Sequence, residues 1–234
     1  MKANSYDSEF NGARAVVTGG AHGIGRAVVR RLADGGASVV TADIKAPPEI
    51  GTTEFFVEAD ISSATGVADI ARFSLEKWGA VDHVVHVVGG SPAVPEGLLG
   101  IDDAAWLEAF NLNVFGAVRL DRALVPSMIE QGRGSIVHVT SIARRQPMVP
   151  TMAYSAAKAA LAAYSKAAAK QLAPLGVRVN AVAPGFIETE GARGLVQDVS
   201  LSTGLALDEA GLCSWKPSAR RRWVGRAGQR RLLN

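Results

Sequence analysis

Short apolar runs alternate with longer stretches of helical periodicity along the first 185 residues of the chain. The runs are continuously apolar or nearly so, as expected of strands that are buried on both faces. The longer stretches repeat apolar side chains three and four residues apart, which is typical of amphipathic helices. The predicted strands are residues 13–18, 38–42, 54–58, 81–88, 135–140 and 178–183.

Predicted helices separate these strands and end at glycine or proline. The first helix stops at Gly35–Gly36, and residues 63–78 form the second. Residues 102–131 carry a long helical pattern that is interrupted near Pro126, and residues 153–172 form an alanine-rich helix. Regular alternation of strands and helices predicts a Rossmann-type, doubly wound parallel sheet in three layers.

Composition restricts the class of protein. An apolar content of 48% in 234 residues fits a globular fold with a sizeable core. The single cysteine, Cys213, excludes an intramolecular disulfide and favours a cytoplasmic setting. Residues 1–12 are polar and lack the apolar segment of a signal peptide, and no run reaches the length of a membrane span. We therefore expect a cytoplasmic protein without a membrane partner.

The net charge of +3 hides an uneven distribution along the chain. Residues 211–234 hold seven of the 25 basic residues and no acid. Residues 1–210 therefore carry 18 basic against 22 acidic side chains, a net charge of −4. We divide the chain into a folded domain, residues 1–210, and a basic, irregular tail, residues 211–234.

A glycine-rich turn, Gly19–Gly25, connects the first strand to the first helix. Glycines at such a turn let the backbone approach a pyrophosphate, and the helix N-terminus favours its negative charge. The second strand ends in Asp43, where a carboxylate accepts hydrogen bonds from the adenosine ribose and repels a 2′-phosphate. This acid favours NAD over NADP, and Lys45 nearby is the one feature that weakens the preference.

Tyr154 and Lys158 are four residues apart and share one face of the predicted helix. A phenol has a pKa near ten, and a neighbouring ammonium lowers it. The pair is therefore suited to moving a proton to or from a carbonyl or alcohol oxygen. So short a motif often occurs by chance, and its interpretation depends on the rest of the chain.

Together these motifs resemble the short-chain dehydrogenase/reductase family over about residues 10–210. Ser141 precedes Tyr154 by thirteen residues and matches the family's catalytic serine in position and spacing. Asn113 matches the asparagine that completes the family's tetrad, and Asn111 is the alternative. The resemblance implies an oxidoreductase that uses NAD(H), with NADP(H) less favoured, to interconvert a carbonyl and a secondary alcohol of a small molecule.

The resemblance also implies a role for each of these side chains. Tyr154 would exchange a proton with the substrate oxygen, and Ser141 would hydrogen-bond that oxygen. Lys158 would lower the tyrosine pKa and bind the nicotinamide ribose, and Asn113 would hold a water that links Lys158 to solvent. The cofactor-binding residues that it implies are Thr18, Gly19, His22, Gly23, Ile24, Gly25, Asp43, Asp60, Ile61, Gly89, Tyr154, Lys158, Pro184, Gly185, Ile187 and Thr189.

The chain departs from the family's pattern after the fourth strand, where His86 replaces the first asparagine of an Asn-Asn-Ala-Gly motif. We expect the fold to tolerate this change. The four histidines, His22, His83, His86 and His138, are scattered and show no metal-ligand spacing. We therefore predict structural roles for most of them and no metal site.

A larger departure follows Ala210, where the family continues to a seventh strand and this chain turns to arginine-rich sequence. We interpret the tail as out of frame relative to the family, with a genuine basic tail as the alternative. The resemblance thus implies that residues 1–210 are an NAD(P)-binding domain with a partial substrate lid. The sheet is then expected to lack its seventh strand. In the family, the two long helices form one dimer contact, so we predict a homodimer through residues 105–130 and 153–172, whereas a tetramer is doubtful.

Two other functions remain open at this point. One is a cofactor-binding protein whose catalysis is impaired by the aberrant C-terminus. The other is nucleic-acid binding through the basic tail, which no other feature supports. The substrate is not identified: Arg144 and Arg145 could face an acidic substrate, but exposed loop arginines are the simpler interpretation.

Overall fold

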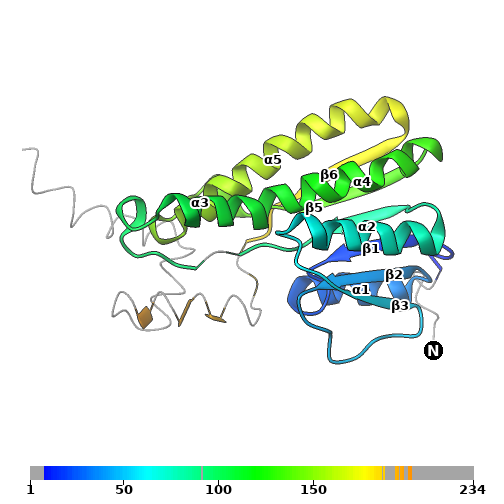
Figure 1. Ribbon diagram of the computed structural model, residues 1–234, viewed down its shortest axis with the longest axis horizontal. Helices are drawn as coiled ribbons and strands as arrows, with labels where there is room; N and C mark the ends of the chain where they lie inside the picture. The colour runs from blue at the N-terminus through cyan, green and yellow to red at the C-terminus, as the bar shows by residue number, and fades with distance from the viewer. Residues whose placement is uncertain are drawn as a thin grey trace, which may run out of the picture.

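The computed structural model describes most of the predicted domain (Figure 1). The seventh strand, the tail and Thr189 lie outside its described residues, so the predictions about them remain predictions. The described residues are 8–90, 92–185, 187, 193–194, 196–197 and 200–201.

Six parallel strands form one sheet in the order β3-β2-β1-β4-β5-β6. This is the order of a doubly wound sheet, in which the direction of winding reverses between β1 and β4. Ligands of such folds bind at the carboxyl ends of the strands beside that reversal. The strands are β1 (Arg14–Thr18), β2 (Ser38–Asp43), β3 (Glu54–Glu58), β4 (His83–His86), β5 (Gly134–Val139) and β6 (Val177–Val182).

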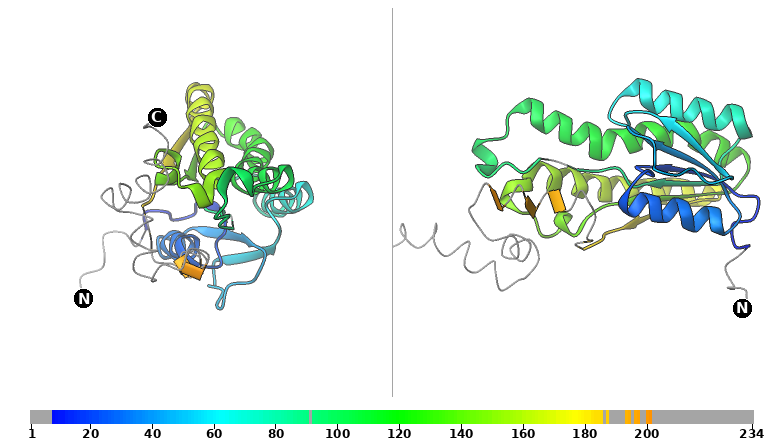
Figure 2. Two further views of the ribbon diagram at one scale, coloured as in Figure 1. Left: turned by 90° about the vertical axis from the view of Figure 1, so that its left-hand side faces the viewer. Right: turned by 90° about the horizontal axis from the view of Figure 1, so that it is seen from below.

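Helices α2, α4 and α5 cover one face of the sheet, and α1 covers the other within the described residues (Figures 1 and 2). The predicted three-layer α/β fold is thereby confirmed. The long helices are α1 (Gly23–Asp34), α2 (Ala64–Trp78), α3 (Asp103–Phe110), α4 (Gly116–Glu130) and α5 (Met152–Leu172). The short ones are η1 (Gly97–Leu99), η2 (Asn111–Phe115), η3 (Ile142–Arg144), η4 (Val149–Thr151) and η5 (Ala173–Leu175).

The apolar core lies mainly under α2, α4 and α5. Ile70, Leu120 and Leu124 from these helices are completely buried against strand residues such as Val16 and Val84. A smaller cluster packs α1 on the opposite face. Burial of this apolar area is the main term that holds helices and sheet together.

The long helical pattern of residues 102–131 breaks earlier than predicted. It is interrupted at η2, one turn of π-helix, and α4 then continues through Pro126 to Glu130. Leu124 and Met128 flank the proline and are fully buried, so tertiary packing maintains the helix there. The interruption comes from Asn113, whose Nδ2 donates to the carbonyl of Ala109 (2.9 Å) within the same helical segment.

A buried polar network lies between the sheet and helices α4 and α5. Asp121 is 3% exposed and accepts hydrogen bonds from His86 Nε2 (2.8 Å), His138 Nε2 (3.0 Å) and the Tyr164 hydroxyl (2.8 Å). Ser165 Oγ lies 2.9 Å from His138 Nδ1. Burial alone would raise the pKa of Asp121, but the two histidines hold it well below its usual range.

This network explains how the sheet accommodates His86. The fold brings together a carboxylate and two histidine nitrogens within 4.8 Å, although the spacing of the histidines in the chain shows no such cluster. Each histidine is hydrogen-bonded to the carboxylate. No motif points to Asp121, and the one signal available is an acid on the apolar face of a predicted helix, beside Leu120 and Leu124.

We predict that Asp121→Asn lowers the free energy of unfolding by about 3–5 kcal/mol, because it breaks a buried charge network. Urea denaturation monitored by circular dichroism measures this change. Asp69→Asn is the control, since Asp69 pairs with Arg72 on the exposed surface of α2 and should change stability by less than about 1 kcal/mol. Equal effects of the two substitutions would contradict the assignment.

Candidate functional site

The predicted catalytic side chains meet at the carboxyl ends of β4 and β5. Ser141 follows β5, Tyr154 and Lys158 lie on the first turns of α5, and Asn113 lies in η2. The Ser141 side chain lies close enough to the Tyr154 hydroxyl to lower its pKa, and Lys158 Nζ lies 5.7 Å from the centre of the Tyr154 ring. Four residues from three parts of the chain thus form one cluster.

Lys158 is a buried amine that strand-end carbonyls hold in place. Its side chain is 2% exposed, and Nζ donates to the carbonyl of Val139 (3.0 Å) and, at a longer distance, to that of Val88 (3.4 Å). Burial lowers the pKa of Lys158 to about 8, since a charged ammonium loses hydration in the interior. Slightly above physiological pH, Lys158 would therefore be neutral in a large fraction of the protein molecules.

Gly89 makes room for this amine. A Cβ atom at Gly89 would lie 2.4 Å from Lys158 Nζ and 2.7 Å from Asn113 Oδ1. The side chain of any other residue would displace both groups. The protein's own amine and amide thus require this glycine, which the sequence pattern assigned only to close approach of the cofactor.

Asn113, and not Asn111, lies beside Lys158. The Asn113 side chain is 2% exposed, donates to the carbonyl of Gly90 (2.8 Å) and accepts from the amide of Gly90 (3.2 Å). Asn111 accepts instead from Arg119 (3.1 Å). Both Nδ2 donors of Asn113 are used within the protein, and one acceptor position on Oδ1 remains.

The pKa of Tyr154 differs from the sequence-based expectation. Burial raises the pKa of Tyr154, and the nearby Ser141 side chain lowers this pKa by a smaller amount. The lowering of the Tyr154 pKa by Lys158, which the sequence suggested, is not found. The physical reason is that the phenol is buried, while the ammonium is directed to the carbonyls of Val139 and Val88.

The glycine-rich turn has the geometry of an anion cradle. Gly19 and Gly23 have positive φ angles of 70° and 51°, and a Cβ on Gly25 would lie 1.8 Å from the carbonyl oxygen of Gly19. The His22 side chain makes no capping hydrogen bond at the N-terminus of α1, which leaves backbone amides for a ligand. Thr18 Oγ1 is buried without a hydrogen-bond partner. These features fit a dinucleotide.

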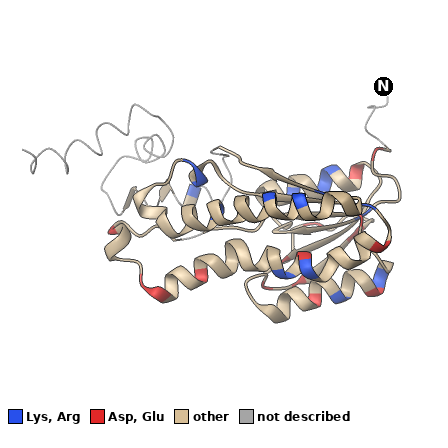
Figure 3. Ribbon diagram, turned by 90° about the horizontal axis from the view of Figure 1, so that it is seen from above, with Lys and Arg blue, Asp and Glu red and all other residues tan. Residues whose placement is uncertain are grey.

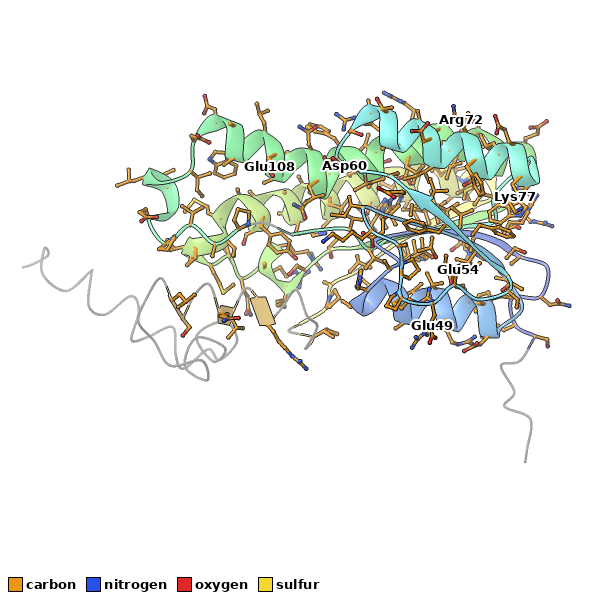
Figure 4. The ribbon with its side chains drawn as sticks, turned by 60° about the horizontal axis from the view of Figure 1, so that its bottom comes forward. Glu49, Glu54, Asp60, Arg72, Lys77 and Glu108 are labelled. Atoms are coloured by element: carbon orange, nitrogen blue, oxygen red, sulfur yellow. The ribbon has the colours of Figure 1, made fainter. Side chains whose placement is uncertain are left out.

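Two acids follow the neighbouring strands at the same edge of the sheet. Asp43 accepts hydrogen bonds from the amides of Ala21 (3.1 Å) and Ile44 (2.8 Å), so its carboxylate lies against the glycine-rich turn. Asp60 is exposed and accepts from the amide of Ser62 (2.8 Å) (Figure 4). The backbones of the two acidic segments are joined by the bond from the Ala59 amide to the Asp43 carbonyl.

The structure describes four further residues that were predicted to bind the cofactor, Ile61, Pro184, Gly185 and Ile187. Ile61 is buried, and Ile187 is 47% exposed. The carbonyl of Pro184 accepts from the amide of Ile142 (3.0 Å), which brings the segment of Pro184 and Gly185 against the turn after Ser141.

Within the described residues, no helix has the length and hydropathy required to cross a bilayer.

An apolar hollow of about 190 Å³ lies next to the cluster. It is bounded by the loop after β4, by α3 and by the residues that precede Tyr154, and Glu108 on α3 supplies its one acidic group (Figure 4). The loops on its two sides are joined by the bond from the Val94 amide to the Pro150 carbonyl (2.7 Å). The lining residues are Gly90, Pro92, Val94, Ile101, Ala105, Glu108, Ala109, Leu112, Pro150, Met152 and Ala153.

Comparison with known proteins agrees with this geometry. Residues 13–200 match the sequence model of the short chain dehydrogenase family. Cis-4-hydroxycyclohexanecarboxylate dehydrogenase of Sinomonas cyclohexanicum is 35% identical over 79% of this chain and 77% of its own. Sorbitol-6-phosphate 2-dehydrogenase of Klebsiella pneumoniae is 33% identical over 76% and 70% of the two chains.

A similar solved structure is L-sorbose reductase from Gluconobacter frateurii, complexed with NADPH and L-sorbose. It superposes with a TM-score of 0.75 at 27% identity, over 85% of this chain and 79% of the other. The chain therefore belongs to the short-chain dehydrogenase/reductase family and is a nicotinamide-dependent oxidoreductase that acts on alcohol or carbonyl groups.

We predict that Lys158 makes the stability of the protein depend on pH above 8. Its pKa is about 8 when folded and 10.5 in the unfolded reference, so between these values only the unfolded state retains the proton. Relative to Lys158→Met, the wild-type protein should then gain up to about 3 kcal/mol of stability as pH rises through this range.

Urea denaturation of both proteins at a series of pH values tests this prediction. Lys166→Met is the matched control, because Lys166 is exposed on the same helix and its removal should leave the pH profile unchanged. A constant stability difference between wild type and Lys158→Met would show that the amine is not perturbed.

Proposed function

We propose that the chain is an NAD(H)-dependent oxidoreductase that interconverts a carbonyl and a secondary alcohol, with Tyr154 as the acid and base. The observation that carries this proposal is the cluster of Ser141, Tyr154 and the buried Lys158 at the carboxyl edge of the sheet. The anion cradle of the glycine-rich turn lies at the same edge. Proton transfer and a nicotinamide cofactor would thus operate side by side.

In the reducing direction, Tyr154 donates its phenolic proton to the substrate oxygen. A raised pKa keeps the phenol protonated at neutral pH, so the group is ready to act as an acid. Ser141 Oγ hydrogen-bonds the same oxygen and stabilises the charge that develops on it. The nicotinamide cofactor, when bound, supplies the hydride to the carbonyl carbon and accepts it in the reverse direction.

Lys158 positions the cofactor and completes the proton path. An ammonium has three donors, of which Val139 and Val88 occupy two, so the third is left for a hydroxyl of the nicotinamide ribose. Asn113 would hold a water next to Lys158 through its remaining acceptor position.

We favour NAD over NADP because of the charges around the adenosine end of the site. The carboxylate of Asp43 would accept hydrogen bonds from ribose hydroxyls and repel a 2′-phosphate. Arg26, the basic residue that follows the glycine-rich turn, is bound to the carboxylate of Glu54 and to the carbonyl of Glu49 (Figure 4). It is therefore not free to neutralise an additional phosphate.

The substrate is a small or medium-sized alcohol or ketone with a polar group. Two relatives are named for a hydroxycyclohexane carboxylate and for a sugar phosphate, which are compounds of this size. The apolar hollow beside Tyr154 would take the carbon skeleton of such a molecule.

We further propose that two copies of the chain pair through residues 105–130 and 153–172. Several apolar side chains on the first of these segments remain exposed in the single chain, including Leu107 (61%), Phe115 (41%) and Ile129 (37%). Covering these side chains would contribute to dimer stability.

Tyr154→Phe should lower kcat by about 10²–10⁴-fold, because it removes the proton donor and acceptor but leaves the ring in place. Binding of NADH, followed by its fluorescence, should change little. Tyr164→Phe is the control on the same helix: it loses the hydrogen bond to Asp121 and some stability, but should keep turnover. Retained turnover in Tyr154→Phe would exclude Tyr154 as the proton-transfer group.

Asp43→Ala should relax the discrimination against NADP. The ratio of kcat/KM for NADP to that for NAD should rise by about 10–100-fold, since a repulsive carboxylate and its bonds to the ribose are both lost. Initial rates with each cofactor at saturating substrate measure this ratio. Lys45→Ala is the control and should move the ratio in the opposite direction or leave it unchanged. An unchanged ratio in Asp43→Ala would remove the basis for NAD selectivity.

A further inference from the structure

Arg144 lies on the turn that carries Ser141. The turn is η3 (Ile142–Arg144), and Ser141 Oγ begins it by accepting a hydrogen bond from the amide of Ala143 (3.1 Å). The amide of Ile142 donates to the carbonyl of Pro184 (3.0 Å). The turn that ends in Arg144 thus begins at Ser141 and contacts the segment proposed to hold the nicotinamide.

The guanidinium of Arg144 has no acceptor in the described part of the chain. Its Nε atom is buried and has no hydrogen-bond partner. The side chain as a whole is half-buried, contrary to the interpretation of both arginines as exposed loop residues. Water satisfies the donors of an exposed arginine, but it cannot reach a buried Nε, and an unsatisfied buried donor destabilises the protein.

Other arginines of this protein provide a comparison for the guanidinium of Arg144. Arg14 binds the carboxylate of Asp82, Arg26 binds Glu54, and Arg119 donates to the carbonyl of Ser62. Each of these partly buried guanidiniums has acceptors from the chain itself. Arg145, next to Arg144, is exposed to solvent. Arg144 combines a buried Nε with the absence of an acceptor among the described residues, at a turn next to the proposed reacting groups.

Figure 3 shows the position of the loop between β5 and α5, which contains Arg144. This loop lies beside the first turns of α5, at the end of the molecule away from the N-terminus. A substrate whose oxygen meets Ser141 and Tyr154 must lie against this loop. An arginine fork matches the two oxygens of a carboxylate or the oxygens of a phosphate better than it matches any neutral group.

We infer that Arg144 binds an anionic group of the substrate, a carboxylate or a phosphate, and makes the enzyme selective for hydroxy or oxo compounds that carry one. The inference rests on the proposed oxidoreductase function and adds the substrate class. The alcohol or ketone reacts at Tyr154, and the anion is held at Arg144. Loss of this contact affects recognition of the charged substrate, because Arg144 takes no part in proton or hydride transfer.

The test uses two pairs of ketones that differ in charge. One pair is 4-oxocyclohexanecarboxylate and its methyl ester, and the other is fructose 6-phosphate and fructose. Reduction is followed by NADH absorbance for wild type, Arg144→Met, Arg144→Lys and Arg145→Met. Arg145→Met removes the same charge from the exposed neighbour and is the matched control. Circular dichroism establishes that each variant is folded.

In the wild type, kcat/KM for the anionic member of at least one pair should exceed that of its neutral partner by about tenfold or more. The pair that shows the preference identifies carboxylate or phosphate. Arg144→Met should lower this ratio at least tenfold, Arg144→Lys should retain part of it, and Arg145→Met should retain all of it. A preference that survives in Arg144→Met, or that Arg145→Met loses equally, would overturn the inference.

Calorimetric titration of the same ketones into each protein, with and without NADH, separates this inference from the proposed function. Preferential binding of the anions that depends on Arg144 supports the inference even if no ketone is reduced, in which case the proposed reaction fails. Reduction of neutral ketones without any preference for anions supports the reaction and contradicts the inference. A weaker affinity of Arg144→Met for NADH alone would assign Arg144 to the cofactor instead and would also contradict it.

Discussion

The site depends on one constraint, the burial of the Lys158 amine, which has no acidic partner among the residues that the structure describes. Nζ has carbonyl acceptors at the ends of two strands, Val139 as the last residue of β5 and Val88 shortly after β4. These carbonyls are available because parallel strands end together at this edge of the sheet. The space for the amine exists because position 89 has no side chain. The order of the strands, the glycine in the loop and the placement of α5 therefore together determine where the Lys158 amine lies.

A second interior charge, at Asp121, stabilises the same helices further from the site. Its carboxylate joins α4 to β4 and β5 through His86 and His138, and to α5 through Tyr164. Helix α5 is thus held by polar groups at two levels: Lys158 near its start bonds strand-end carbonyls, and Tyr164 near its middle bonds Asp121 on α4. Such attachment restricts how far Tyr154 can move relative to Ser141 and the glycine-rich turn, which proton transfer over a hydrogen-bond distance requires.

Much of this arrangement could be predicted from the sequence, because it depends on local patterns. Apolar runs predicted the strands, and the positions of Ser141, Tyr154 and Lys158 in the chain predicted that they would meet. The features that were missed depend on long-range contacts. The π-turn at η2 arises from bonds of Asn113 to Gly90 and Ala109, and the network of Asp121 joins four elements. The raised pKa of Tyr154 and the unsatisfied Arg144 both follow from burial, which no spacing of residues reveals.

In the proposed enzyme, a rigid sheet edge would bring a proton donor, Tyr154, next to a hydride carrier. The most direct test of this account is to incubate the protein with NADH that carries deuterium at both C4 positions and a panel of ketones, and to analyse the alcohols by mass spectrometry. The account predicts an alcohol that carries one deuterium on its carbinol carbon. Binding of NADH without any deuterated alcohol across the panel would contradict it.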